Sequence, residues 1–200
     1  MSANSSSTLW NTMLEANQRF AEGTPARPNQ DEDRRAALQA GQNPYACVFT
    51  CSDSRVPAEL IFDAGLGDLF VVRTAGEVVD IGVMATLEFA VAGLGVELLV
   101  IMGHQNCGAV KATAEVYEGA DLPPAQQRVL VEQILPSITK AKQAGMHDRE
   151  DFERQHAARM AEKILSTSSV IREAVEAGRL NVVAARYKLD DATVETVAAW

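Results

Sequence analysis

The sequence predicts an α/β fold with a mostly parallel central sheet flanked by helices. Short apolar runs at 45–50, 69–73 and 96–103 alternate with segments of helical periodicity, and parallel strands require such crossover helices. We also expect an antiparallel edge strand and an N-terminal helical arm. With 200 residues, the chain suits one sizeable core. We therefore assign an arm to 1–30 and a single catalytic domain to 31–200.

The expected arm carries an apolar stripe. Leu9, Trp10, Met13 and Phe20 recur at helical spacing before the Pro-bearing segment TPARPNQ. An apolar stripe of this size has to be buried against another surface. We expect a partner subunit to provide that surface.

Helix signals separate the expected strands. Pro57 suits the first position of a short helix that Gly65 would end. Asp80 is expected to cap a second helix, which continues to the glycines of GLG at 93–95. Strands and helices in this order indicate right-handed crossovers.

The C-terminal part is predicted to be mostly helical. Helical patterns cover 125–144, 148–165 and 168–177, and NVVAARYKL at 181–189 reads as a last strand. We expect this strand to lie at a sheet edge.

The composition excludes several classes of partner. Eighteen Lys and Arg against 27 Asp and Glu give a net charge of −9, which disfavours nucleic acid and anionic membranes. No apolar run approaches the ~20 residues of a membrane span, and the N-terminus lacks the pattern of a signal peptide. We expect a cytoplasmic protein. An odd set of three cysteines in such a chain argues against a disulfide framework.

Two polar motifs each follow an expected buried strand. CSDSR begins at Cys51, and HQNC runs from His104 to Cys107. In open α/β sheets ligands bind at this end of the strands. Two cysteines and one histidine suit zinc, and three protein ligands leave a fourth position open for water. Cys47, inside the strand, is interpreted as a small buried apolar residue.

A cysteine nucleophile is the competing interpretation of Cys51. A thiolate at a strand end can attack substrates, as in phosphatases and rhodaneses. SDSRVP, however, lacks the glycines of a phosphate cradle and places Asp53 two residues away. That carboxylate would repel an anionic substrate.

Together the motifs resemble the β-class carbonic anhydrases. CSDSR, FVVR and HQNCGAV occur in this order, and the resemblance extends from about residue 10 to YKLDD at 187–191. GLGDLFVVRTAG and YKLDD are similar to actinobacterial members. The resemblance implies reversible hydration of carbon dioxide to bicarbonate and a proton, by a hydroxide held on zinc. It also implies homodimers or homotetramers whose sites lie at subunit interfaces.

The resemblance also implies roles for individual residues. One zinc ion per chain would be bound by Cys51, His104 and Cys107. Asp53 and Arg55 would form the catalytic pair.

A substrate pocket is implied around Gln42, Phe70 and Gly108. Gln42 and the amide of Gly108 would orient carbon dioxide or bicarbonate, and Phe70 would form part of an apolar wall. Phe89 stands where many relatives have tyrosine. No role of that hydroxyl can be carried over.

Asp53 has two opposed options beside a metal. It can orient the nucleophile, or it can ligate zinc and close the site. A bidentate clamp by Arg55 would hold the carboxylate off the metal and keep it ionised. We therefore expect the arginine-paired form to be active, with lower pH favouring the closed form.

Two alternatives to carbon dioxide hydration stay open. One is hydrolysis of carbonyl sulfide or carbon disulfide, and the other is a zinc module without turnover. Outside the motifs, His147, His156 and the charged run DREDFER are interpreted as solvated surface.

Overall fold

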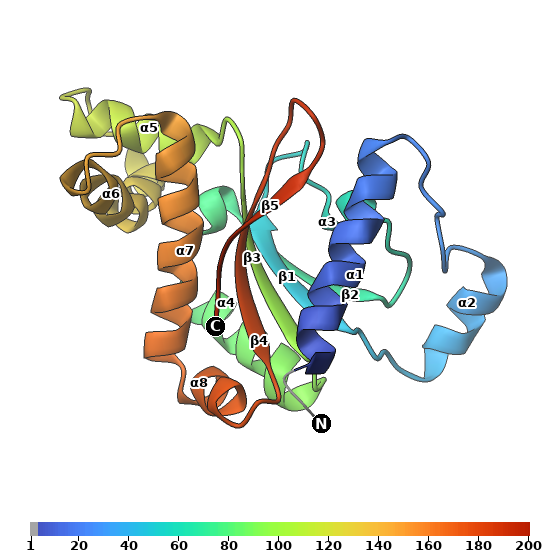
Figure 1. Ribbon diagram of the computed structural model, residues 1–200. Coiled ribbons are helices and arrows are strands. Elements are labelled where there is room, and N and C mark those ends of the chain that lie inside the picture. The colour runs from blue at the N-terminus through green and yellow to red at the C-terminus, as the bar shows by residue number, and fades with distance from the viewer. Residues whose placement is uncertain (1–3) are drawn as a thin grey trace.

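The computed structural model describes residues 4–200 and contains one five-stranded sheet (Figure 1). The strand order is β2-β1-β3-β4-β5. The bounds are Ala46–Cys51 for β1, Leu69–Thr74 for β2, Leu98–His104 for β3, Asn181–Tyr187 for β4 and Val194–Ala199 for β5. The first four strands are parallel, and β5 is antiparallel to β4. The predicted α/β class with an antiparallel edge strand is confirmed.

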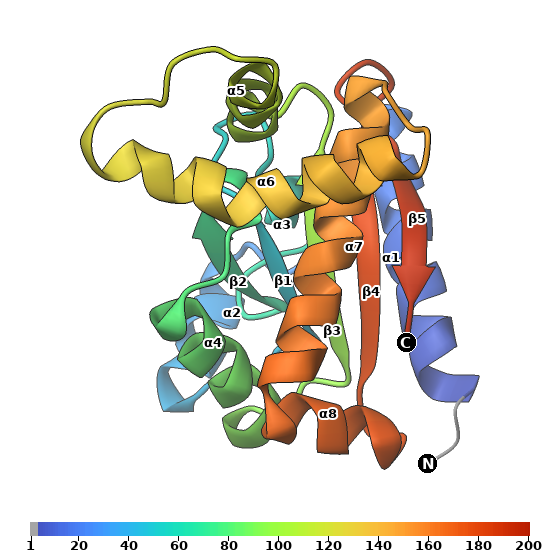
Figure 2. The same cartoon turned by 90° about the vertical axis from the view of Figure 1, so that its left-hand side faces the viewer.

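Helices cover both faces of this sheet (Figures 1 and 2). Their bounds are Asn4–Ala21 for α1, Glu32–Ala37 for α2, Ala58–Ile61 for α3, Ile81–Glu88 for α4, Gly108–Tyr117 for α5, Arg128–Gln143 for α6, Arg149–Thr167 for α7 and Ser169–Glu176 for α8. α4, α7 and α8 lie on one face and α1 on the other. β1 and β3 are buried along their whole length, which explains their continuous apolar runs.

The N-terminal arm packs on its own chain, so the expectation that a partner covers its stripe is wrong. Trp10 and Met13 are buried in the core on the α1 face of the sheet. Asn17 is also buried: its amide donates to the carbonyls of Ile61 and Ala192, and its oxygen accepts from Val194 N. Helical periodicity shows that a stripe needs a cover, but it does not show which chain provides one. Residues 1–3 of the assigned arm lie outside the described part.

The last predicted strand is not an edge strand. β4 lies between β3 and β5, and the antiparallel edge strand is β5, in a segment where the sequence analysis placed no strand. Buried on both faces, β4 has the apolar character expected of an internal parallel strand.

The helix that Asp80 caps is divided into two parts. Asp80 accepts a hydrogen bond from Val83 N at 2.8 Å, as predicted for an N-cap. After α4 the chain continues as a short π-helix over Phe89–Gly93. Such segments are frequent at functional sites, and this one places Phe89 at the surface beside Phe70 of β2, with 6.2 Å between ring centroids.

Two surface interpretations are also wrong. His156 of α7 is fully buried, and so is Glu153 in the charged run DREDFER. The ring of His156 donates from Nε2 to the carbonyl of Gly76 at 2.8 Å and accepts from the Ser137 hydroxyl at 2.9 Å. These two bonds satisfy a neutral imidazole, so the residue can be buried. His147 is exposed, as expected.

The buried His156 should make the protein less stable in acid. Burial lowers its pKa from 6.5 to about 4, so the unfolded chain binds a proton that the folded chain excludes. The neutral, buried imidazole contributes about 3 kcal/mol to the free energy of unfolding. This contribution is complete above pH 6.5 and is lost as the pH falls toward 4. Urea unfolding at pH 7.5 and 5.0 should show a smaller pH dependence for His156→Gln than for wild type. His147→Gln is the matched control, and an equal change in both variants would contradict the prediction.

No helix in the described range 4–200 is both long and apolar enough to cross a membrane.

Candidate metal centre

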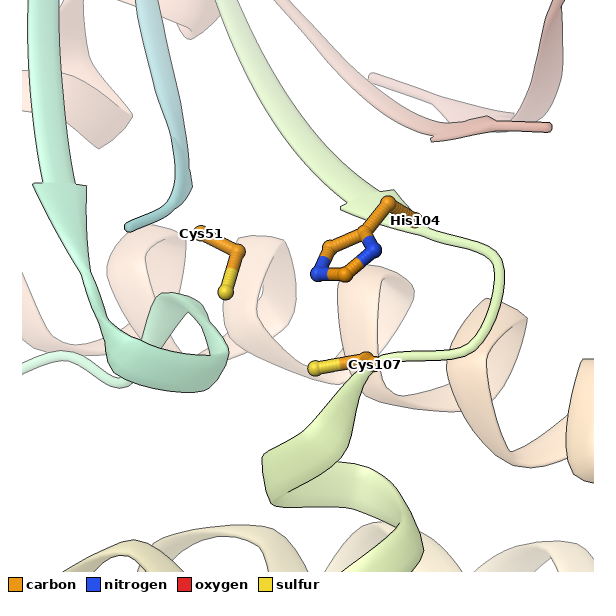
Figure 3. A group of neighbouring side chains, drawn as sticks. All are labelled: Cys51, His104 and Cys107. Atoms are coloured by element: carbon orange, nitrogen blue, oxygen red, sulfur yellow. The ribbon is translucent and has the colours of Figure 1, made fainter. Parts of the chain in front are cut away.

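Three predicted metal ligands meet at the carboxyl edge of the sheet (Figure 3). Cys51 is the last residue of β1, His104 ends β3, and Cys107 precedes the first turn of α5. Neighbouring parallel strands end at this edge, so the fold brings residues more than 50 positions apart together. Their ligand atoms all lie within 4.8 Å of one another.

A glycine allows the backbone to approach Cys51. The amide of Gly76 donates to Cys51 Sγ at 3.2 Å. Gly76 has φ +64°, and a Cβ there would lie 2.7 Å from the Cβ of Ala109. Only glycine fits this position without strain.

The hydrogen bonds of His104 leave one nitrogen available for a metal. Nδ1 donates to the carbonyl of Gln105 at 2.9 Å. This bond fixes the tautomer and leaves the lone pair on Nε2. Nε2 is buried and has no hydrogen-bond partner among the described residues. A buried unpaired acceptor is costly, and a metal ion would satisfy it.

The two thiols shift each other's pKa in opposite directions. The neighbouring Cys107 thiol lowers the pKa of Cys51 to about 4. The Cys51 thiol, together with burial, raises the pKa of Cys107. A metal ion would bind both sulfurs as thiolates and would release the remaining thiol proton. Cys47 stays outside this group, and burial raises its pKa to about 12, which supports its interpretation as an inert core residue.

The donor set fits zinc. Two thiolates and one imidazole are typical zinc ligands, and a catalytic zinc site has three protein ligands and an open position. Cys51, His104 and Cys107 form a group of this kind in the described part of the chain.

Asp53 and Arg55 form a bidentate ion pair next to the group. Arg55 Nε and Nη2 lie 2.9 and 2.7 Å from the two carboxylate oxygens, and the amide of Arg55 donates to Oδ1 at 2.9 Å. The guanidinium bonds hold the pKa of the Asp53 carboxyl well below its usual range. Oδ2 of Asp53 lies 4.0 Å from His104 Nε2, so the carboxylate borders the metal position while it is bound to arginine.

Two further residues, which the sequence analysis missed, hold this loop. Arg73 of β2 donates to the carbonyls of Cys51 at 3.0 Å and Asp53 at 2.6 Å. Asn106, with φ +56°, accepts from Arg55 at its carbonyl. FVVR was noted in the sequence only for its resemblance, but a charged residue at the end of an apolar strand was a usable signal.

One chain does not bring all the predicted pocket residues together. Gly108 begins α5 next to Cys107, and the space beyond its Cα is open. Phe70 pairs with Cys47 in the sheet register, four residues before Cys51 and thus about 13 Å from its level. Gln42 precedes β1 and lies beyond the opposite end of that strand.

The fold and the site define the class of protein as an α/β protein with a Cys₂His group that could hold a zinc ion. The family model described as "Carbonic anhydrase" matches residues 46–194. The chain is 43% identical over 182 residues to "Carbonic anhydrase 2" of Mycobacterium tuberculosis, covering 91% of this chain and 88% of that protein. It is 42% identical over 186 residues to a carbonic anhydrase of Mycolicibacterium smegmatis, with coverages of 93% and 90%.

Solved structures agree on the fold. The β-carbonic anhydrase of Coccomyxa in complex with acetazolamide matches with a TM-score of 0.74 at 23% identity, over 94% of this chain and 86% of that one. Tetrameric β-carbonic anhydrases of Sordaria macrospora match with a TM-score of 0.74 at 22% identity, over 96% and 99%. The chain belongs to the carbonic anhydrase family, in its zinc-dependent β class.

Proposed function

We propose that reversible hydration of carbon dioxide takes place at the Cys51, His104 and Cys107 centre, with Asp53 and Arg55 as the catalytic pair. The observation that carries this proposal is the bidentate pair itself, which holds a carboxylate beside an open three-ligand site. A purely structural zinc site would more often have a fourth protein ligand.

When bound, zinc lowers the pKa of a water molecule toward neutrality and so supplies hydroxide, and two thiolates should make this effect weaker than three imidazoles do. Asp53 orients the nucleophile by accepting a hydrogen bond from it. Arg55 keeps Asp53 ionised and turned toward the guanidinium. Because the guanidinium of Arg55 binds both carboxylate oxygens of Asp53, neither oxygen is free to move into the open coordination position.

The substrate is oriented by groups around this position. Carbon dioxide is uncharged, so it needs an apolar wall and few donors. The space where a Cβ of Gly108 would lie, next to Cys107, is open, and we assign the Gly108 amide to a substrate oxygen. Gln42 and Phe70 take the other two pocket roles, although they lie away from the metal ligands of their own chain.

We infer that a second copy of the chain supplies Gln42 and Phe70. β2 is an edge strand, and within residues 4–200 no strand pairs with its outer side. Phe89, 54% exposed, packs against Phe70 at this edge, which supports burial of the aromatic pair in a homodimer or homotetramer. The three free cysteines fit a reducing compartment, and we propose a cytoplasmic enzyme.

Stopped-flow hydration of carbon dioxide from pH 6.5 to 9, with zinc measured on the same sample, tests the proposal. We expect about one zinc per chain and a rate that rises with pH, because hydroxide and the arginine-paired Asp53 are both favoured by alkali. A flat profile would contradict the assigned roles. Full zinc occupancy without turnover at pH 8.5 would favour a non-catalytic module.

Carbonyl sulfide and carbon disulfide are the alternative substrates, and the same sample should be assayed with both. A carbon disulfide hydrolase matches the fold with a TM-score of 0.54 at 16% identity, over 82% of this chain and 87% of that one. Turnover of these compounds without carbon dioxide hydration would favour this alternative.

A further inference from the structure

A buried ion pair lies behind the metal centre. Glu153 of α7 and Arg186 of β4 are 1% and 0% exposed, and Glu153 Oε2 lies 2.8 Å from Arg186 Nε. Burying two charges has a desolvation cost that an ion pair often fails to offset, and apolar residues of similar size are frequently as stable. Stability alone is therefore a weak reason for this pair.

The other oxygen of Glu153 points to a role at the metal. Oε1 accepts from the backbone amide of Cys107 at 3.4 Å. Cys107 caps α5 without a side-chain cap bond, and it follows Asn106, which has φ +56°. The peptide group between Asn106 and Cys107 thus sits in a tight turn, and its orientation determines where Cys107 Sγ points.

Arg186 makes this contact electrostatically acceptable. The zinc site carries two thiolates, so an unpaired carboxylate behind it would repel them. Arg186 neutralises Glu153 and is in turn held by Glu195 of β5, 3.2 Å from Nη1. Glu195 also binds Arg154 at 2.7 Å. Arg154 therefore belongs to the same network, but no contact links it to Cys107.

We propose that Glu153, held by Arg186, is a positioning residue for Cys107 that slows the loss of zinc. The proposal rests on the zinc site and not on the assigned reaction. Groups that orient metal ligands typically change metal affinity 10- to 100-fold when they are removed.

The test is the rate at which a chelator removes zinc from the double variant Glu153→Leu/Arg186→Met. This variant removes the bond to Cys107 and leaves neither charge of the pair buried alone. We expect release about 10- to 100-fold faster than in wild type. The cobalt-substituted double variant should also show a shifted thiolate-to-metal absorption band. Arg154→Gln, the matched control in the same network, should match wild type in both readouts.

Wild-type release and an unshifted band in the folded double variant would overturn the proposal, because the pair would then be structural only. If the double variant does not fold, the rate of zinc release from Glu153→Gln tests the proposal instead. This variant has nearly the same volume and leaves Arg186 paired with Glu195, and we expect about threefold faster release or more. Release at the wild-type rate would again reject the proposal. Neither readout depends on carbon dioxide hydration, so a failure here is distinguishable from a failure of the proposed roles.

Discussion

Replacement of Arg55 by alanine is expected to lower kcat/KM for carbon dioxide hydration by about a hundredfold or more. The guanidinium holds both oxygens of Asp53 at 2.7–2.9 Å. Without it the carboxylate stays ionised at pH 8.5, but it is free to turn toward the metal position, which it borders: Oδ2 of Asp53 lies 4.0 Å from Nε2 of His104. An ionised carboxylate in the open position blocks the nucleophile. Alkaline pH should therefore not restore activity.

The measurement is stopped-flow hydration from pH 7 to 9, with zinc content determined on each sample. Arg149→Ala is the matched control, because Arg149 is exposed and binds the side chain of Asn106 at 3.3 Å without reaching Asp53. We expect its rate within about twofold of wild type. Arg55→Lys keeps the charge but loses the fork, so its rate should lie between those of Arg55→Ala and wild type. If kcat/KM of zinc-loaded Arg55→Ala falls by less than tenfold, the proposed role of Arg55 in holding Asp53 away from the metal is rejected.

The grouping of Cys51, His104 and Cys107 could be predicted because it depends on local signals. Apolar runs identify the strands, and the polar motifs that follow them identify the sheet edge where Cys51 and His104 meet. Asp80 could be assigned as an N-cap for the same reason: the cap bond spans three residues. Such features need no knowledge of distant parts of the chain.

The buried charges could not be predicted in the same way. Glu153 belongs to a charged run whose first three residues are exposed, and the approach of β4 and the Cys107 turn gives it partners. His156 can be buried because the carbonyl of Gly76, 80 positions away in the sequence, accepts a hydrogen bond from its Nε2. Arg186 was the available signal, since an arginine within an apolar strand requires a buried counter-ion. The short strand β5 was missed because its alternation of polar and apolar residues is weak.

The second large expected effect concerns the assembly. If Gln42 acts across the interface, a site combines the metal ligands of one copy with Gln42 of the other. Cys51→Ala should abolish zinc binding in its own chain, and Gln42→Ala should slow hydration about tenfold or more while zinc is retained. In a mixed dimer of the two variants, one site contains both defects and the other contains neither.

Mixed dimers, co-expressed with two affinity tags and purified through both, should therefore recover about half of the wild-type rate per dimer. Mixed dimers of Cys51→Ala and His104→Ala are the control: both defects affect the metal ligands, so no intact site can form in either arrangement. If Gln42 instead acted within its own chain, the first pair would show no more than the residual activity of Gln42→Ala. Such a result would leave the zinc centre as assigned and reject the contribution of the second copy.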